Sequence, residues 1–412
     1  MKIAPRICLL VVMLLIACVN NQPKTIKSTE CFDLAAIPNL ESFHNDTANI
    51  QVFAIGESTH GSSTLLATRI ELTKILIEKS HFRTVGIEAT FNEVLELNKF
   101  ASGASDENAE IVVKRLGYPF LANVDFTNFL KWLKEYNSRR KSYERVEIFG
   151  IDTSVSNAPI KGIMDFVKKY SKSLSLTFDT LFRAVQDSGI YRMEPSLHSS
   201  ILKPIDPFLE DKLQIAQKLI RIDSQKLISL SSKEEFELLK FNLTMIEQLN
   251  DRVQYSISSI KSQNSRDSSM FLNVKNHASA TNKVIVWAHN EHIKVNDHSN
   301  PQKTMGTFLK KHFANRFANI GIDFGAGKYH KNTSYGLQVD QALAIEKLYA
   351  KPDEVGYYDF LRIKDQNCIL KVDIHSLGAL SENWSFQEQV INYAYTGYIY
   401  VPVSKELNLL DR

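Results

Sequence analysis

Short apolar segments alternate with helical patterns over much of this 412-residue chain. Five segments are rich in apolar and β-branched residues and have the length of buried strands, at residues 52–56, 84–89, 146–151, 284–288 and 319–324. Three of them are followed closely by a helical pattern, which is typical of strand–helix–strand units. The continuous apolar run 284–288 fits a central strand covered on both faces. The sequence therefore predicts an α/β fold, with a mainly parallel central sheet flanked by helices.

Long helical patterns replace the strand signal between residues 157 and 280. Ser232 and Glu235 have the spacing of a capping box at the start of one helix. The inner face of that helix would carry Leu239, Leu243, Ile246, Leu249 and Val253. We expect an inserted helical subdomain at residues 157–280. It would separate a first part of the α/β core at 46–156 from a second part at 281–412, which ends with a late strand near 398–403.

The first 17 residues have the organisation of a signal peptide. Lys2 and Arg6 precede an apolar run at 7–17 that is too short to span a membrane. The run ends in Leu-Ile-Ala-Cys, which resembles a bacterial lipobox whose cleavage leaves Cys18 as a lipidated N-terminus. A polar tether would follow at residues 18–45. These features predict a protein of the cell envelope, on the extracytoplasmic side, anchored to a bacterial membrane by its N-terminal lipid.

The charge balance excludes one class of partner. The chain has 49 Lys and Arg against 46 Asp and Glu, a net charge of +3. Nucleic-acid-binding proteins need a clustered excess of basic residues, so no nucleic acid is expected. No feature of the sequence implies a protein partner either. Cys31 and Cys368 remain after Cys18 and could pair in an oxidising compartment.

Titratable side chains lie at the ends of the predicted strands or just beyond them. In chain order they are Glu57 with His60, Glu88, Asp152, His289 with His292, and Asp323. Ligands of open parallel sheets bind beyond the carboxyl ends of the strands, where the loops surround one crevice. We therefore expect these side chains to converge in a catalytic site.

The segment around His60 favours a functional role over that of an ordinary surface histidine. Glycines flank the segment 57–60, so a tight turn would present the imidazole. Arg69 follows two turns into the next predicted helix, among core-facing positions. It needs an anionic partner there, such as Glu57 or Glu88. Pairing with Arg69 would also be expected if Glu88 had only a structural role.

The spacing of His289 and His292 raises the question of a metal ion. Two histidines three residues apart are common metal ligands, and carboxylates are expected nearby. The pair follows a strand, however, and is not the HExxH helix of zinc proteases. The alternative is that one histidine orients substrate or water while the other bonds a carboxylate. We expect no cofactor and keep the metal as the alternative.

Other catalytic devices are missing from the sequence. It has no GxSxG segment for a serine nucleophile and no glycine-rich phosphate loop. The cysteines lack a clear adjacent base. What remains is histidine and carboxylate chemistry on an activated water.

Four ordered motifs resemble the erythromycin esterase family. They are IGESTHG at 55–61, RDxxMxxN at 266–273, WAHNEH at 287–292, and late glycine-containing blocks at 305–306 and 320–327. Arg69 follows His60 by nine residues, and Glu88 lies nineteen residues further on. The resemblance covers roughly residues 50–330. Thr64 departs from it, because many members carry an acidic residue there, and this leaves the substrate open.

The resemblance implies an α/β core with a helical insertion, and hydrolysis of a macrolide lactone by water without a covalent enzyme intermediate. The positions that it implies are a general base at His60, supporting charges at Glu57, Arg69 and Glu88, and a second histidine pair at His289 and His292. Membership of a family does not by itself fix the substrate.

These observations predict a carboxylic-ester hydrolase acting on a small-molecule ester or lactone. His60 would take a proton from a water held near Glu57 or Glu88, and His289 would contact the oxyanion or orient the substrate. The residues expected to contact the substrate are His292, Asp152 and Arg266. One alternative is a metal-dependent hydrolase that uses the second histidine pair. The other is a catalytically silent, lipid-anchored ligand-binding protein.

Overall fold

The computed structural model describes residues 47–116, 118–153, 157–189, 191–195, 200–256, 259–333, 336–342, 356–360, 371–375 and 386–410. The predicted signal peptide, the whole of the predicted tether, and Cys18, Cys31 and Cys368 lie outside these residues. Within the described residues, we find no helix with the length and apolar character needed to cross a membrane.

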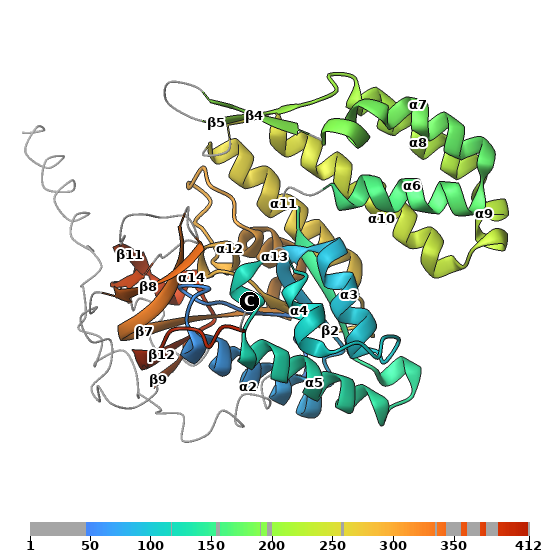
Figure 1. The fold of residues 1–412 in the computed structure, drawn as a ribbon. Coiled ribbons are helices and arrows are strands. Elements are labelled where there is room, and N and C mark those ends of the chain that lie inside the picture. The colour runs from blue at the N-terminus through green and yellow to red at the C-terminus, as the bar shows by residue number, and fades with distance from the viewer. Residues whose placement is uncertain are drawn as a thin grey trace, which may run out of the picture.

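An eight-stranded sheet forms the centre of the described structure (Figure 1). Its order is β3 (Glu147–Asp152), β2 (Thr84–Thr90), β6 (Val284–Trp287), β1 (Val52–Ile55), β7 (Phe317–Thr333), β12 (Gly397–Ser404) and β9 (Gly356–Asp359), and β8 (Gly336–Ala342) pairs with β7. The pairs from β3 through β12 are parallel, whereas β9 and β8 are antiparallel to their neighbours. The prediction of an α/β fold with a mainly parallel sheet is confirmed.

Both faces of the sheet are covered, because its central strands are apolar on both sides. Phe53 and Ile55 of β1 belong to one buried cluster, and Val52 and Ala54 belong to another, as the alternation of a strand requires. The first cluster lies under α2 (Ser63–Lys79), α3 (Phe91–Ala101), α4 (Ala109–Lys114) and α5 (Val124–Ser138). The second lies under α11 (Ile260–His277) and α13 (Met305–Phe313).

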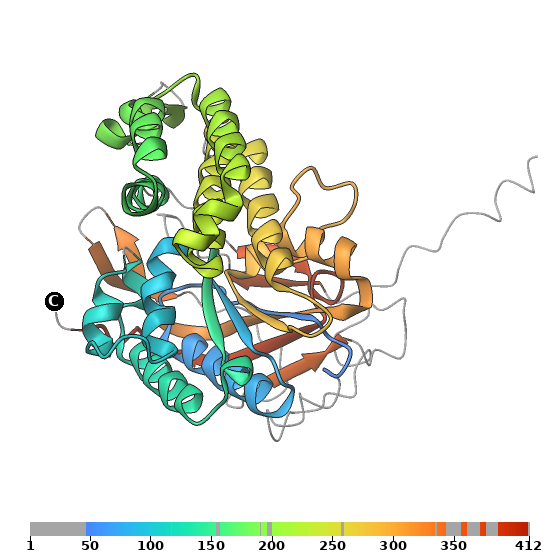
Figure 2. The same ribbon diagram turned by 90° about the vertical axis from the view of Figure 1, so that its right-hand side faces the viewer.

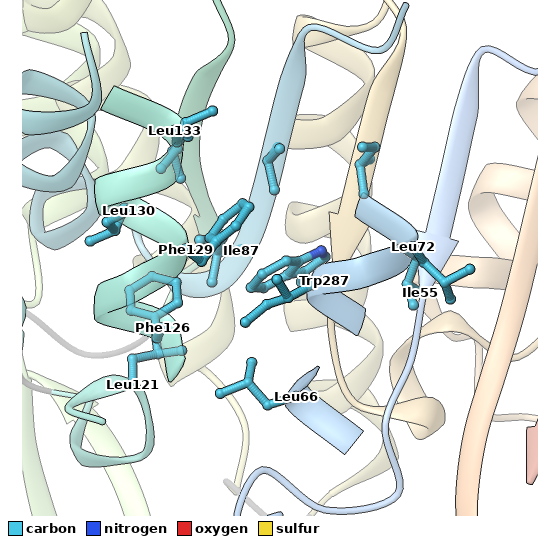
Figure 3. Close-up of a cluster of buried hydrophobic side chains, with 14 of the residues drawn as sticks. Ile55, Leu66, Leu72, Ile87, Leu121, Phe126, Phe129, Leu130, Leu133 and Trp287 are labelled. Carbon is cyan, nitrogen blue, oxygen red and sulfur yellow. The ribbon is translucent and has the colours of Figure 1, made fainter. Parts of the chain in front are cut away.

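Trp287, at the end of β6, is fully buried in the first cluster. Figure 3 shows it between Phe129 and Phe126 of α5, Leu66 of α2 and Ile87 of β2. Its ring centroid is 5.1 Å from that of Phe129 and 6.3 Å from that of Phe126. These contacts fix the end of β6, from which WAHNEH continues into α12 (Asn290–Ile293).

A helical subdomain stands away from the sheet in both views (Figures 1 and 2). It contains α6 (Ala158–Tyr170), α7 (Lys172–Ser188), α8 (Leu209–Ile222), α9 (Ser224–Leu230) and α10 (Lys233–Val253). Their buried residues form a hydrophobic cluster of their own. The long helix α11 returns the chain to the sheet, where Met270 and Val274 join the second cluster. The predicted inserted helical subdomain is therefore present.

Local signals within this subdomain behave as the sequence predicts. Ser232 accepts a hydrogen bond from the amide of Glu235 at 3.1 Å and so caps α10. The predicted inner face of α10, residues 239–253 at helical spacing, is buried in the cluster. In the α/β core, Ser62 caps α2, because its side chain accepts from the amide of Leu65.

Two predictions about strands were wrong. The insertion is not purely helical, because β4 (Tyr191–Pro195) and β5 (Ser200–Pro204) form a hairpin between α7 and α8. These strands carry charged residues and prolines and lack an apolar run, so periodicity misses them. The strand predicted at 319–324 is also too short. It continues to Thr333 as a ribbon with β8, beyond the apolar segment.

The remaining elements are short. They are η2 (Pro119–Leu121), η3 (Ser142–Glu144), η4 (Ala314–Arg316), α14 (Ile391–Ala394), and a separate two-stranded sheet of β10 (Lys371–His375) and β11 (Phe386–Val390). The predicted late strand is present as β12.

Candidate active site

Glu57 and His60 lie in the turn between β1 and α2, which is held rigidly. The amides of Gly56 and Ser58 donate to main-chain oxygens of β7 at 2.8 and 3.0 Å, so the turn continues the pairing of β1. A Cβ on Gly56 would collide with the side chain of Asn290. One on Gly61 would collide with the main chain of β7. Glycine is therefore required at both ends of the segment that presents His60.

His60, Glu57 and Arg69 form a chain of contacts. His60 Nδ1 lies 2.7 Å from Glu57 Oε1, and the other carboxylate oxygen of Glu57 pairs with Arg69 Nη2. The guanidinium of Arg69 lies 5.2 Å from the ring centroid of Trp287. Burial lowers the pKa of Arg69 to about 9, which still leaves a cation at neutral pH. Glu57, which pairs with Arg69, accepts the Nδ1 proton, so Nε2 is the free nitrogen of a neutral His60.

The free nitrogen of His60 faces Glu88. Nε2 lies 3.9 Å from Glu88 Oε2, a separation at which one water can contact both atoms at hydrogen-bond distance. Burial lowers the pKa of His60, although the carboxylate of Glu88 opposes the shift. A histidine that is neutral at pH 7 and aimed at such a position can act as a general base.

Glu88 joins three other parts of the site. Its Oε2 accepts from the amide of His289 at 2.7 Å, and its Oε1 accepts from Arg266 Nη2 at 2.9 Å. Oε1 also lies 3.4 Å from His292 Nε2. Burial raises the pKa of Glu88, but His292, His60 and Arg266 outweigh it and hold the pKa well below its ordinary value. Glu88 is therefore an anion at the centre of the network.

Arg266 connects the returning helix α11 to the sheet. Its Nε and Nη2 donate to the two carboxylate oxygens of Asp152, at 2.9 and 2.7 Å. Its Nη1 lies 2.9 Å from His292 Nε2. Burial opposes ionisation of Asp152, but Arg266 outweighs it and lowers the pKa of that carboxyl. The bidentate pair fixes the guanidinium, so the contacts of Arg266 with the protein support a positioning role more directly than the predicted contact with substrate.

His289 is held by the main chain. Its Nδ1 accepts from the amide of Glu291 at 3.2 Å, and its Nε2 lies 2.9 Å from the carbonyl oxygen of Ser58. The ring centroids of His289 and His60 are 5.4 Å apart. Burial lowers the pKa of His289 to about 4, so the ring is neutral with its proton on Nε2. That proton is directed at Ser58, and the predicted contact of His289 with an oxyanion stays a prediction.

His292 contacts a carboxylate that the sequence reasoning did not assign to the site. Its Nδ1 lies 2.8 Å from Asp267 Oδ1, and the same oxygen accepts from the amide of Met305 at 2.8 Å. Burial alone lowers the pKa of His292, but Asp267 and Glu88 raise it to about 10. Asp267 was noted only as part of the RDxxMxxN motif, and its position next to Arg266 was a signal that could have identified it.

The structure thus brings all eight predicted catalytic and substrate-contacting residues into one network. The contacts of Asp323 lie outside this network. Asp323 lies within β7, where its carboxylate contacts the ring and amide of His375 at 2.8 and 2.9 Å. Two aromatic residues near His60 were not predicted from the sequence. The ring centroids of Tyr118 and Phe120 lie 5.6 and 5.7 Å from that of His60. They follow no strand, so nothing in the pattern marked them.

The grouping of potential metal ligands bears on the metal-dependent alternative. Across the ranges that the structure describes, no three His, Cys, Asp or Glu side chains are grouped in a way that could hold a metal ion.

Comparison with known proteins gives a family match and several structural neighbours. The family model described as erythromycin esterase matches residues 77–405. A crystal structure of a Bacillus cereus protein has a TM-score of 0.71 at 16% identity, covering 92% of this chain and 96% of its own. A succinoglycan biosynthesis protein has a TM-score of 0.70 at 17% identity, covering 90% and 92%. A histidine-to-asparagine mutant of an erythromycin esterase, in its open conformation, has a TM-score of 0.66 at 15% identity, covering 95% and 98%. At these identities the structural likeness shows the fold alone.

Proposed function

This chain belongs to the erythromycin esterase family, and from this premise we propose that it cleaves an ester or a macrolide-type lactone with a water molecule activated by His60. The family implies a hydrolase. The substrate class and the mechanism are our proposal, as is the assignment of roles to the residues of the site.

One observation carries the proposal. His60 is supported at Nδ1 by the carboxylate of Glu57, which Arg69 holds in turn, and its Nε2 faces Glu88 across 3.9 Å. A base needs a fixed ring, a free lone pair and a position for the water, and this arrangement supplies all three. A protein that only bound its ligand would have no use for this combination.

In the proposed reaction, water lies between His60 Nε2 and Glu88 Oε2. His60 removes a proton as the water oxygen attacks the carbonyl carbon, and no covalent intermediate forms with the protein. A main-chain amide in the turn at Gly61 would be one candidate donor to the oxyanion. In the structure, however, the amide of Gly61 donates to Thr59 Oγ1 at 3.2 Å. The hydroxyl of Tyr118 is an alternative donor, because this partly exposed side chain has its ring centroid 5.6 Å from that of His60.

The experiment is a hydrolysis screen by mass spectrometry over macrolides, other cyclic esters and sugar esters. The wild type should release an acid and an alcohol from at least one of them. His60→Ala should reduce kcat on that substrate by roughly a hundredfold to ten-thousandfold. His277→Ala is the matched control, because His277 bonds a main-chain oxygen at 2.9 Å on α11, away from the network.

Two outcomes would replace the proposal. Loss of activity on dialysis against EDTA, with recovery by one divalent ion, would support the metal-dependent alternative. Binding of a compound from the screen without any turnover would support the silent binding protein. Full activity in His60→Ala would remove the general base.

We also propose that the chain is a lipoprotein, with residues 1–17 as signal peptide, a tether at 18–45 and attachment through Cys18. The charged leader and the lipobox-like motif support this. Several acyl chains on one cysteine would anchor the protein firmly. Cys18→Ser should release it from membranes, and a variant that stays bound after a salt wash would contradict the anchor.

A further inference from the structure

The C-terminal segment, residues 404–410, is attached to the turn that presents His60. The amide of Ser63 donates to the carbonyl oxygen of Lys405 at 2.9 Å, and the amide of Lys405 donates to Thr64 Oγ1 at 3.1 Å. Thr64 is the position that departs from the pattern of the family, and in this chain its side chain is an attachment point for the segment. The C-terminal segment therefore packs along the start of α2.

The same segment is attached to the loop that precedes α5. The amide of Val124 donates to the carbonyl oxygen of Asn408 at 2.9 Å, and the amide of Leu410 donates to that of Ala122 at 3.1 Å. This loop carries the two aromatic rings whose centroids lie 5.6 and 5.7 Å from that of His60. The segment thus connects two parts of the chain that flank the imidazole.

His330 of β7 contacts both the turn and the C-terminal segment. Its main-chain amide donates to the carbonyl oxygen of Gly61 at 2.9 Å, and its Nδ1 accepts from the amide of Leu407 at 3.1 Å. His330 is 8% exposed, and Leu407 is buried in the first hydrophobic cluster. Burial lowers the pKa of His330, although Glu406 opposes the shift, so the ring is neutral at pH 7 and Nδ1 has a lone pair with which to accept.

Building on the function proposed above, we infer that His330 is a positioning residue, which holds the C-terminal segment and thereby keeps the two aromatic rings of the loop against His60. The catalytic consequence of this inference rests on the proposed function. A catalytic group must keep its productive position to within about 0.5 Å and 10–20°. Glu57 fixes one nitrogen of the imidazole at 2.7 Å. The rings of Tyr118 and Phe120 limit the tilt of the imidazole about that contact.

The loop fixes its own shape but not its distance from the turn of His60. Asn123 donates to the carbonyl oxygen of Phe120 at 2.7 Å, and its side chain caps α5. These two contacts lie within the loop and its helix. The C-terminal segment relates the loop to the turn, because it bonds to both. Loss of the acceptor on His330 would leave the buried amide of Leu407 without its partner, and the segment would have to move to satisfy it.

Kinetics test the catalytic consequence. His330→Leu removes the acceptor, whereas His330→Asn offers an oxygen near the position of Nδ1. On an ester that the wild type cleaves, His330→Leu should lower kcat by roughly tenfold to hundredfold, because a displacement of about 1 Å can cost that much. His330→Asn should recover most of this loss. His298→Leu, in an exposed turn, is the matched control and should behave as the wild type. Equal kcat in the two leucine variants would overturn the inference.

A measurement without substrate separates positioning from stability. Ring currents of the two neighbouring aromatic rings shift the proton NMR signal of His60 Cε1, which the His60→Ala variant identifies by its loss. In His330→Leu that is folded by circular dichroism, the signal should move toward that of an exposed histidine, and His330→Asn should restore it. An unchanged signal would overturn the inference. If no ester is cleaved, or if His60→Ala keeps full activity, the proposed function fails and the NMR signal alone decides the inference.

A second variant tests the same connection if His330→Leu does not fold. Leu410→Pro removes the amide that donates to Ala122, and Leu410→Ala, which keeps this amide, is its control. The proline variant should lower kcat severalfold and shift the signal of His60, whereas the alanine variant should change neither. The same result in both variants would overturn the role of the C-terminal segment.

Discussion

In the turn after β1, Glu57 lies only three residues from His60, and Arg69 follows in the next helix. On the other side of the site, Arg266 contacts Asp152 and Glu88 across separations of 114 and 178 residues. The first half is built locally by one strand, one turn and one helix. The second half exists only when α11 has returned from the helical subdomain and docked on the sheet. Closing the contacts of the first half therefore costs less loop entropy, whereas the half around Arg266 depends on the whole fold.

The two halves also differ in charge. Glu57 and Arg69 balance each other as one anion and one cation. Around Arg266, a single guanidinium serves several carboxylates, so its loss would leave buried negative charge without compensation. This difference predicts that loss of a charged side chain lowers the free energy of unfolding more in the half around Arg266 than in the half around His60.

Arg266→Met should show the largest effect. Removing one partner from a buried ion pair typically costs about 3 to 5 kcal/mol in the free energy of unfolding. Displacement of Glu88 and His292 should also lower kcat by roughly a hundredfold or more. Urea denaturation and steady-state kinetics measure the two effects. Arg115→Met is the control, because its pair with Glu107 is exposed to solvent and should contribute little to stability. Equal destabilisation by both variants would remove the contrast between the halves.

Glu57→Gln should have a smaller effect, confined to the local half. The amide keeps the shape of the side chain but no longer holds His60 Nδ1 as a carboxylate does. We expect kcat to fall about tenfold to hundredfold, as is usual for groups that orient a functional histidine. The loss of stability should be smaller than in Arg266→Met. An equal loss in the two variants would show that the halves are one coupled unit.

The acid limb of the pH profile tests the half of the site around His60, because it reports the pKa of the base. Burial lowers the pKa of His60 from its ordinary value of 6.5. Its neutral form is the base, so kcat/KM should hold as the pH drops to 6.5 and decline only below it. A profile of kcat/KM between pH 4 and 8 measures the limb. A midpoint above 6.5 would mean that the neighbouring carboxylates outweigh burial, or that another group is titrating.

Ser232→Ala should have the smallest effect on the site. Loss of this helix cap should cost about 1 kcal/mol in stability. Activity at low temperature should remain, because the start of α10 lies at the end of the helical subdomain that is remote from the sheet (Figure 1). A fall in kcat beyond about twofold would indicate that the subdomain transmits strain to Arg266.

The half of the site around His60 could be predicted from the sequence, whereas much of the half around Arg266 could not. Glycines around a strand end mark the turn of His60, and the core-facing position of Arg69 demands a partner nearby. The predicted central strands have the right places for a similar reason, since apolar runs report burial. Asp267 and Tyr118 gain their roles from segments that meet only in three dimensions, and no local pattern records such a meeting. Asp323 shows the converse, because a position on a strand does not tell which partner its side chain finds.

Trp287 touches both the apolar core and the charged site. Its indole nitrogen donates to Thr73 Oγ1 at 2.8 Å, and its ring lies under the guanidinium of Arg69. Indole emission is sensitive to a nearby charge and to the polarity around the ring. The protein thus contains its own optical probe, whose fluorescence should change when ligand or acid disturbs the pair of Glu57 and Arg69, without any label being attached.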